Sequence, residues 1–160
     1  MPDATPCVTL TAALLEKIGE QIERTSHLIG LVPAERLNWR PQAGDWTTSE
    51  LIGHLHDCIS GFCAVLVAAE PKRLAHFAKL REVPPAMELY TAHMVEGFAL
   101  LTDADLARRV PTVFVAEGES VLTLLLGNLE HLINHKHQLF TYLKQMGVAV
   151  ATPDLYRFRA

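Results

Sequence analysis

Two histidines four residues apart, His131 and His135, are the side chains in this sequence best suited to chemistry. They lie in the longest stretch with a helical spacing of apolar residues, residues 120–146. Four residues make just over one helical turn, so both imidazoles leave the same face with Cβ atoms ~5–6 Å apart. That separation lets both rings bind one metal ion, each nitrogen at ~2.0–2.1 Å. Polar rings in a helix built for burial need partners, and a metal ion would supply one.

A third ligand is expected from an earlier helical stretch, residues 47–69, which carries His54 and His56. These two positions are about 200° apart around a helix, so only one of them can face the interior of a bundle. His54 lies on the apolar side and is selected, whereas His56 is predicted to lean toward the surface. Cys58, four residues after His54, is either a further ligand or a small buried apolar side chain, and the second interpretation is favoured.

A histidine pair at this spacing also arises by chance, so a non-metal interpretation stays open. In that interpretation the rings form hydrogen bonds with neighbours such as Asn128, Asn134 or Gln138. The zinc-protease pattern His-Glu-x-x-His is excluded, because Leu132 follows His131 where that pattern has a glutamate. Structural or surface roles are expected for the other histidines: His27, His76, His93 and His137.

Composition and length favour one small domain over residues 1–160. The net charge of −4 and the scattered lysines and arginines argue against a nucleic-acid partner. The three cysteines, Cys7, Cys58 and Cys63, form no disulfide framework, which indicates a reducing compartment. No signal peptide is recognised at the start. The uninterrupted apolar runs fall far short of the ~20 residues of a membrane span, so a cytoplasmic protein without a membrane partner is expected.

Four segments have helical periodicity: residues 10–29, 47–69, 85–101 and 120–146. Thr47 and Glu50 form a predicted capping box at the start of the second segment, and Gly147 is the predicted C′ residue after the fourth. The β-branched stretch 109–118 predicts an irregular or short extended crossover. The expected fold is all-α, a four-helix bundle with one long crossover connection, whose metal sites form between facing helices.

Three stretches in this order resemble the DinB/YfiT-like family of small bacterial four-helix proteins. The first is Trp-Arg-Pro and Gly-Asp-Trp-Thr within residues 31–47, which resembles the family's entry to its second helix. The second is Glu-Leu-Ile-Gly-His-Leu-His-Asp at residues 50–57. The third, residues 131–147, is similar to the family's His-x-x-His-His-Arg-Gly-Gln stretch and its Tyr-Leu-Arg-x-x-Gly ending.

The resemblance implies a divalent metal ion, zinc or nickel, on His54, His131 and His135, with solvent completing the coordination shell. It also implies homodimers and, for some members, transfer chemistry with low-molecular-weight thiols. The chain departs from the family pattern in three places. The first histidine of the family's pair is Asn134 here, and its Arg-Gly is Lys136-His137. The bulk of His137 is expected to disturb helix packing or partner contacts, not the ligand trio.

Three hypotheses about function follow. The first is a metal-dependent enzyme, a hydrolase or a thiol-dependent transferase acting on a small-molecule substrate, because three neutral imidazoles leave metal positions open. The second is a non-catalytic metal- or ligand-binding bundle with a stress-related role. The third is an interaction module whose histidines bind nothing.

No catalytic residue is assigned from the sequence. Side chains near the trio that could handle protons are Asp57, Glu130, Gln138 and Tyr142. Gln138, three residues after His135, is either a group that orients this imidazole or a water, or a polar residue of the helix surface. The aromatic residues Trp39, Trp46 and Phe140 either line a substrate pocket or serve as loop anchors and core, and the second role is favoured.

Overall fold

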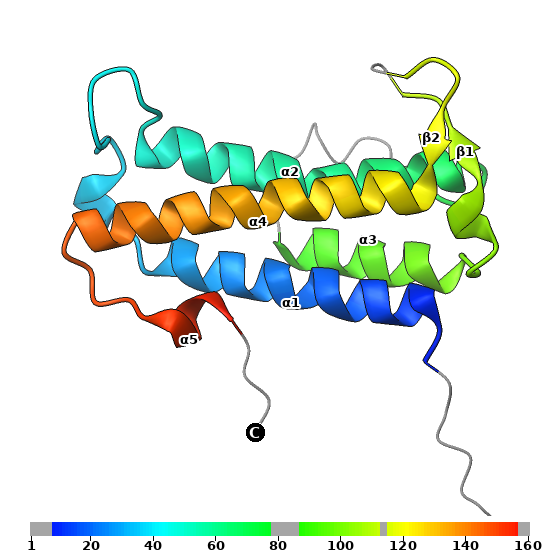
Figure 1. Cartoon of the computed structure of the whole chain (residues 1–160), viewed down its shortest axis with the longest axis horizontal. Helices are drawn as coiled ribbons and strands as arrows, with labels where there is room; N and C mark the ends of the chain where they lie inside the picture. The colour runs from blue at the N-terminus through cyan, green and yellow to red at the C-terminus, as the bar shows by residue number, and fades with distance from the viewer. Residues whose placement is uncertain (1–7, 78–86, 113–114, 157–160) are drawn as a thin grey trace, which may run out of the picture.

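A computed structural model describes residues 8–77, 87–112 and 115–156, and four long helices dominate them (Figure 1). The all-α class predicted from the sequence is confirmed. In chain order the long helices are α1 (Leu10–Gly30), α2 (Thr48–Ala69), α3 (Met87–Ala99) and α4 (Val121–Gln145). Shorter elements are η1 (Ala34–Arg36), η2 (Ala75–Phe77), η4 (Asp105–Ala107), the strands β1 (Arg109–Val110) and β2 (Glu119–Ser120), and the one-turn helix α5 (Thr152–Leu155).

The helix ends follow capping signals in the sequence. Thr47 Oγ1 accepts a hydrogen bond from the N–H of Glu50 at 3.2 Å, and Glu50 Oε2 accepts one from the N–H of Thr47 at 2.7 Å. This is the predicted capping box. Gly147 follows α4 at φ +81°, as expected of a C′ glycine. Helix α3 ends at Ala99, before the predicted end at residue 101, and the predicted start at Pro85 lies outside the described residues.

The long helices form a ring in which α2 and α1 each pack between α3 and α4 (Figure 1). Helix α4 runs antiparallel to α2, and the Asn128 side chain lies against Gly61. Helix α3 runs parallel to α2, with the Cys63 thiol at the carbonyl of Tyr90. Helices that are consecutive in the chain and run parallel require a long crossover connection, which therefore falls between the end of α2 and the start of α3. The predicted four-helix bundle with one long crossover connection is therefore confirmed.

The predicted crossover around residues 109–118 folds back on itself just before α4. Strand β1 pairs antiparallel with β2, in the register Arg109 opposite Ser120 and Val110 opposite Glu119. Gly118 has φ +83°, and a Cβ there would lie 3.0 Å from the carbonyl carbon of Val110. Glycine is thus required for this tight return. The result is a short arm beside the start of α4 and the end of α2 (Figure 1).

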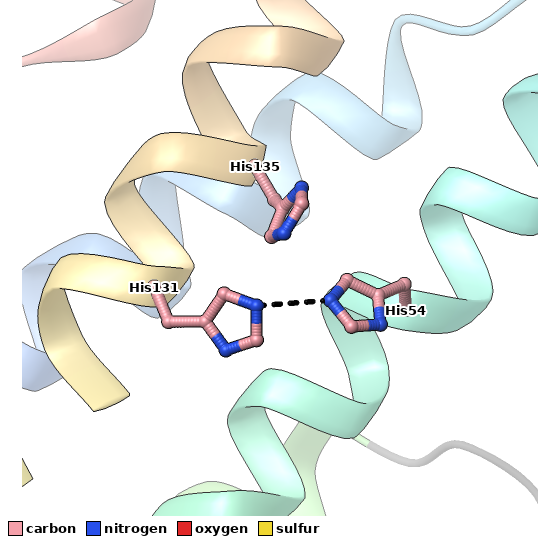
Figure 2. A group of neighbouring side chains, drawn as sticks. All are labelled: His54, His131 and His135. Carbon is pink, nitrogen blue, oxygen red and sulfur yellow. Dashed lines mark hydrogen bonds between the residues drawn. The ribbon is translucent and has the colours of Figure 1, made fainter. Parts of the chain in front are cut away.

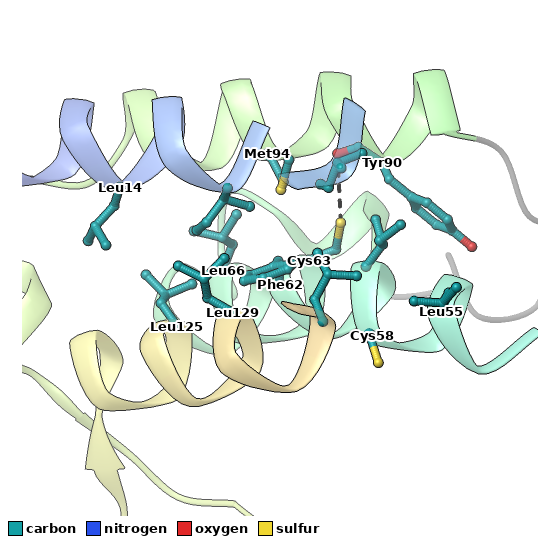
Figure 3. Packing of buried hydrophobic residues seen from close by; sticks show 14 of the residues in the cluster. Leu14, Leu55, Cys58, Phe62, Cys63, Leu66, Tyr90, Met94, Leu125 and Leu129 are labelled. Atoms are coloured by element: carbon teal, nitrogen blue, oxygen red, sulfur yellow. Dashed lines mark hydrogen bonds between the residues drawn. The ribbon is translucent and has the colours of Figure 1, made fainter. Parts of the chain in front are cut away.

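The core lies along the inward face of α2 (Figure 3). Phe62 and Leu66 are fully buried and pack in one cluster with Leu125 and Leu129 of α4. On the α3 side, a Cβ on Gly97 would come within 2.8 Å of Leu66 Cδ1, so glycine permits the close approach of α2 and α3. Burial of each such leucine or phenylalanine contributes about 1.5–3 kcal/mol to folding.

Helix α2 is also long and apolar enough to cross a membrane, by length and composition alone. It has 22 residues, and an 18-residue stretch within it has a mean hydropathy of 1.6. Polar residues interrupt the apolar runs within α2, so the prediction from uninterrupted apolar runs did not include this helix. The place of α2 in the bundle accounts for its composition, since core helices of soluble proteins pass the same test.

A buried lysine ties the C-terminal turn to the bundle. Lys136 is 2 % exposed, and its Nζ donates to Gln21 Oε1 at 2.6 Å and to the carbonyl of Leu155 at 2.8 Å. Burial lowers the pKa of Lys136 to about 8. Lys136, which stands where the family pattern has arginine, therefore anchors α5 against α1 and α4. It lies on a side of α4 away from His131 and His135.

Candidate metal centre

His54 is positioned by the start of α2. The capping box fixes Thr48 as the first helical residue, so the helix phase that carries His54 is set locally. Fully buried Leu51 and Leu55 flank His54 and hold that face toward the bundle. His54 is accordingly half-buried at the seam between α2 and α4, with its ring directed toward α4 (Figure 2).

The three predicted ligands come together. His131 and His135, one turn apart on α4, meet His54 from α2 (Figure 2). One ligand nitrogen from each residue lies within 4.8 Å of the others. His54 Nε2 and His131 Nε2 are 3.1 Å apart, within hydrogen-bond distance. The ring centroids of the three imidazoles are separated by 4.4–5.0 Å.

The donor set fits a divalent metal ion. Two nitrogens each ~2.05 Å from a tetrahedral ion are about 3.3 Å apart, close to the 3.1 Å between His54 Nε2 and His131 Nε2. The widest nitrogen separation, within 4.8 Å, would close by small rotations of the imidazoles. Among the described residues no fourth side chain joins this ligand group, and three imidazoles alone are the pattern of a zinc site with an open position. The group could therefore bind a metal ion.

Gln138 fixes the orientation of one imidazole. His135 Nδ1 lies 2.9 Å from Gln138 Oε1, and because an amide oxygen only accepts, the Nδ1–H donates. The Nε2 lone pair of the neutral ring is then free for a metal ion. Of the two roles considered for Gln138, orienting this imidazole is the one its contact supports.

The hydrogen bonds continue from Gln138 to the entry of α2. Gln138 Nε2 donates to Tyr142 Oη at 3.4 Å, and Tyr142 Oη–H donates to the carbonyl of Trp46 at 3.1 Å. The Trp46 ring covers two of the imidazoles, with centroid distances of 4.8 Å to His54 and 5.5 Å to His135. Trp46 thus lines the site, contrary to the anchor role favoured for it from the sequence.

The other two aromatic residues named from the sequence lie outside the trio. Trp39 packs edge-on against Tyr142, with a centroid distance of 5.4 Å. Phe140 is 5 % exposed and belongs to the core. The favoured roles of loop anchor and core residue thus fit Trp39 and Phe140.

Burial disfavours a positive charge on two of the imidazoles, His54 and His131. It is the largest cause that lowers the pKa of His54, followed by the neighbouring His135 and His131. Burial also lowers the pKa of His131, with His135 as the second cause. Low imidazole pKa values suit metal binding, because a metal ion binds the neutral ring and competes with protons for it.

Cys58 lies beside the trio without joining it. Its Sγ is 3.8 Å from His131 Nδ1, on the opposite side of that ring from the nitrogen that faces His54. Burial raises the pKa of the Cys58 thiol to about 11, so it stays protonated near neutral pH. A protonated thiol is a weak hydrogen-bond partner for His131, which agrees with the favoured interpretation of Cys58 as a small buried side chain.

The remaining histidines lie apart from the trio, and one differs from its prediction. His56 is half-buried, and its ring lies 6.5 Å from that of Tyr90, because α3 covers the side of α2 that was expected to reach the surface. His137 is exposed, so its bulk does not disturb helix packing within the chain. His93 is fully buried, with Nε2 3.3 Å from the carbonyl of Cys63.

Two solved structures have a similar fold. A DinB-like protein from Bacillus subtilis, YjoA, gives a TM-score of 0.68 at 19% identity, covering 91% of this chain and 96% of that chain. A protein assigned to the DinB family from Exiguobacterium sibiricum gives 0.60 at 24% identity, covering 91% and 97%. Identities this low show the fold alone.

Comparison with curated proteins gives no match. The family evidence comes from the sequence model of the DinB superfamily, which matches residues 18–139. That span contains α2, most of α4 and all three clustered histidines. Because the match covers well over half of the sequence and the fold agrees, the chain belongs to the DinB superfamily.

Proposed function

We propose that this protein binds one divalent metal ion through His54, His131 and His135 and acts as a metal-dependent enzyme on a small molecule. The convergence of three imidazoles from α2 and α4 carries this proposal. The Nδ1–H of His135 is committed to Gln138, which leaves its Nε2 for the metal ion. Zinc and nickel are the proposed metals, since both load readily onto imidazole ligands.

The proposed reaction class is hydrolysis or transfer with a low-molecular-weight thiol. When bound, a divalent ion on three imidazoles supplies an electrophilic centre with open positions for a substrate or thiol. Residues of this chain would orient and cover that centre. Gln138 holds the ring of His135, and Trp46 shields two of the imidazoles from solvent. A homodimeric assembly, which the family resemblance implies, is part of the same proposal.

A non-catalytic metal-binding bundle is the second candidate. The observation that favours it concerns proton transfer: among the described residues, no carboxylate forms a hydrogen bond with any of the three imidazoles. In the His-Glu-x-x-His metalloproteases, by comparison, a glutamate beside the metal ligands serves as general base. Both candidate functions predict metal binding, but only the enzyme predicts turnover of a substrate.

The test is elemental analysis of protein purified without chelator or affinity tag. We expect about one zinc or nickel ion per chain in the parent and almost none in a His54→Ala/His135→Ala double variant. His137→Ala is the matched control, because His137 is exposed on the same helix outside the trio. The proposal is wrong if the parent protein holds no metal even after reconstitution at about pH 7.5, where imidazoles are neutral.

Metal-loaded protein is then screened with ester, amide and thiol-transfer substrates. Turnover that disappears in the double variant and persists in His137→Ala supports the enzyme. Metal binding without turnover in either class favours the non-catalytic bundle.

A further inference from the structure

A pocket of about 460 Å³ opens along the α2–α4 seam, beyond the candidate metal centre toward the start of α4. Its volume falls within the ~300–1,000 Å³ typical of small-molecule sites. Small α2 side chains leave room for it, and apolar side chains from α4 and the arm around β1 and β2 form most of its wall. Its apolar lining includes Gly61, Ala64, Ala68, Val110, Val115 and Leu124, and its polar lining is Thr112, Glu119 and Asn128.

Asn128 joins the pocket to the candidate metal centre. It lines the pocket and precedes His131 by three residues, which is ~4.5 Å along the helix axis. Its Nδ2 donates to the carbonyl of Cys58 at 2.7 Å, so its amide crosses the seam. A Cβ on Gly61 would come within 2.8 Å of Asn128 Oδ1, so glycine at this position makes room for that crossing. Pocket and histidines therefore lie along the same α2–α4 seam, with the Asn128 amide between them.

The trio is least covered at His131. Trp46 covers His54 and His135 from the end of the seam where α2 begins. His131 is the exposed member of the trio, and it is also the member nearest Asn128 along α4. A molecule reaching the histidines past His131 would lay its remaining part toward the pocket.

We propose that the pocket binds the apolar part of the substrate, which makes the substrate class a small amphiphile. Its polar end reaches the three histidines, and its alkyl or ring portion lies between Ala64 and Leu124. Leu124 precedes His131 by seven residues, ~10.5 Å along the axis, which corresponds to a chain of about eight carbons. This assignment rests on the proposed metal function.

A second groove of about 670 Å³ does not compete for this role. It lies between α1 and α3, on the seam opposite α2 and α4. The one cluster of potential metal ligands found among the described residues is the histidine trio, which lies on the other seam.

The experiment measures how zinc-loaded protein binds a series of n-alkyl hydroxamates, from acetohydroxamate to the eight-carbon member. The hydroxamate group is a metal-binding probe, and the alkyl chain probes the pocket. Each buried methylene should tighten the dissociation constant about fourfold. In Ala64→Phe, which fills the pocket from an exposed α2 position, we expect the dependence on chain length to flatten while acetohydroxamate affinity stays unchanged. Ala13→Phe, at an exposed position of α1, is the matched control and should keep the full dependence.

The two proposals fail in different ways. If acetohydroxamate binds and longer chains bind no more tightly, the pocket assignment is wrong and the metal centre stands. If the protein holds no zinc, 1-hexanol is titrated into the metal-free protein while the methyl NMR signals of Val65, Val110 and Val115 are followed. Shifts confined to these methyls, and lost in Ala64→Phe, support the pocket. Unchanged signals overturn it.

Discussion

Replacing Gln138 by leucine should weaken metal binding while leaving the bundle folded. Gln138 is half-buried on α4, and leucine has a similar size and a high helix propensity. The substitution removes the acceptor that His135 Nδ1–H uses at 2.9 Å. Without it the His135 ring can rotate or adopt the other tautomer, which places a hydrogen on the nitrogen needed for the metal.

The size of the effect follows from this hydrogen bond. A neutral hydrogen bond contributes about 0.5–1.5 kcal/mol, and one to a charged group about 1.5–3 kcal/mol. A metal ion polarises the imidazole, which strengthens its N–H as a donor, whereas partial exposure of Gln138 lets water replace some of the lost interaction. A loss of about 1.4–2 kcal/mol results, a tenfold to thirtyfold weaker dissociation constant, within the range for groups that orient metal ligands.

The assay is competition for zinc against a chromophoric chelator at about pH 7.5, where free imidazoles are neutral. Gln138→Glu retains an acceptor for His135 Nδ1–H and should bind zinc at least as tightly as the parent. Gln145→Leu, an exposed position on the same helix, controls for the general effect of the substitution. If Gln138→Leu binds zinc within about threefold of the parent, Gln138 does not set the orientation of His135.

Two further predictions concern stability. Thr47→Ala removes the side-chain acceptor for the N–H of Glu50 and should cost about 1 kcal/mol, lowering Tm by about 2–4 °C in thermal circular dichroism; an unchanged Tm would show that the capping box adds nothing. Burial holds the pKa of His93 below its ordinary 6.5, so below about pH 6.5 the unfolded chain binds more protons and the free energy of unfolding falls on acidification. Urea titrations at several pH values should show a smaller fall for His93→Leu, and an equal fall in both proteins would contradict the reasoning.

The parts of the structure that could be predicted from the sequence depend on nearby residues. The start of α2 depends on Thr47 and Glu50, which are three residues apart, and the phase of His54 follows from that start. The pairing of His131 and His135 needs only one helical turn. The family resemblance then indicated that these two segments face each other, which the structure confirms.

The parts that could not be predicted depend on residues distant in the sequence. The helical spacing of His54 and His56 predicts that the two side chains point to different sides of α2. It does not predict that α3 covers the side that carries His56. The hydrogen bond from Tyr142 to the carbonyl of Trp46 joins positions 96 residues apart. The role of Trp46 in lining the site therefore depends on the folded bundle. The pocket likewise needs Gly61 on α2 to meet Asn128 on α4.

The charge of the site narrows the substrate class further. The three imidazoles would bind a divalent ion as neutral ligands, and Cys58 Sγ contacts the nitrogen of His131 that does not face His54. No carboxylate among the described residues is hydrogen-bonded to the trio. Burial lowers the pKa of His54, and Asp57 is the carboxylate close enough to act against that effect, since its charge raises the imidazole pKa. One carboxylate without a hydrogen bond to the trio leaves part of a divalent charge unbalanced, which favours a substrate or co-substrate that binds as an anion. An anionic head with an apolar tail matches both the histidines and the adjoining pocket, so thiols and carboxylates with alkyl chains are the substrates to screen first.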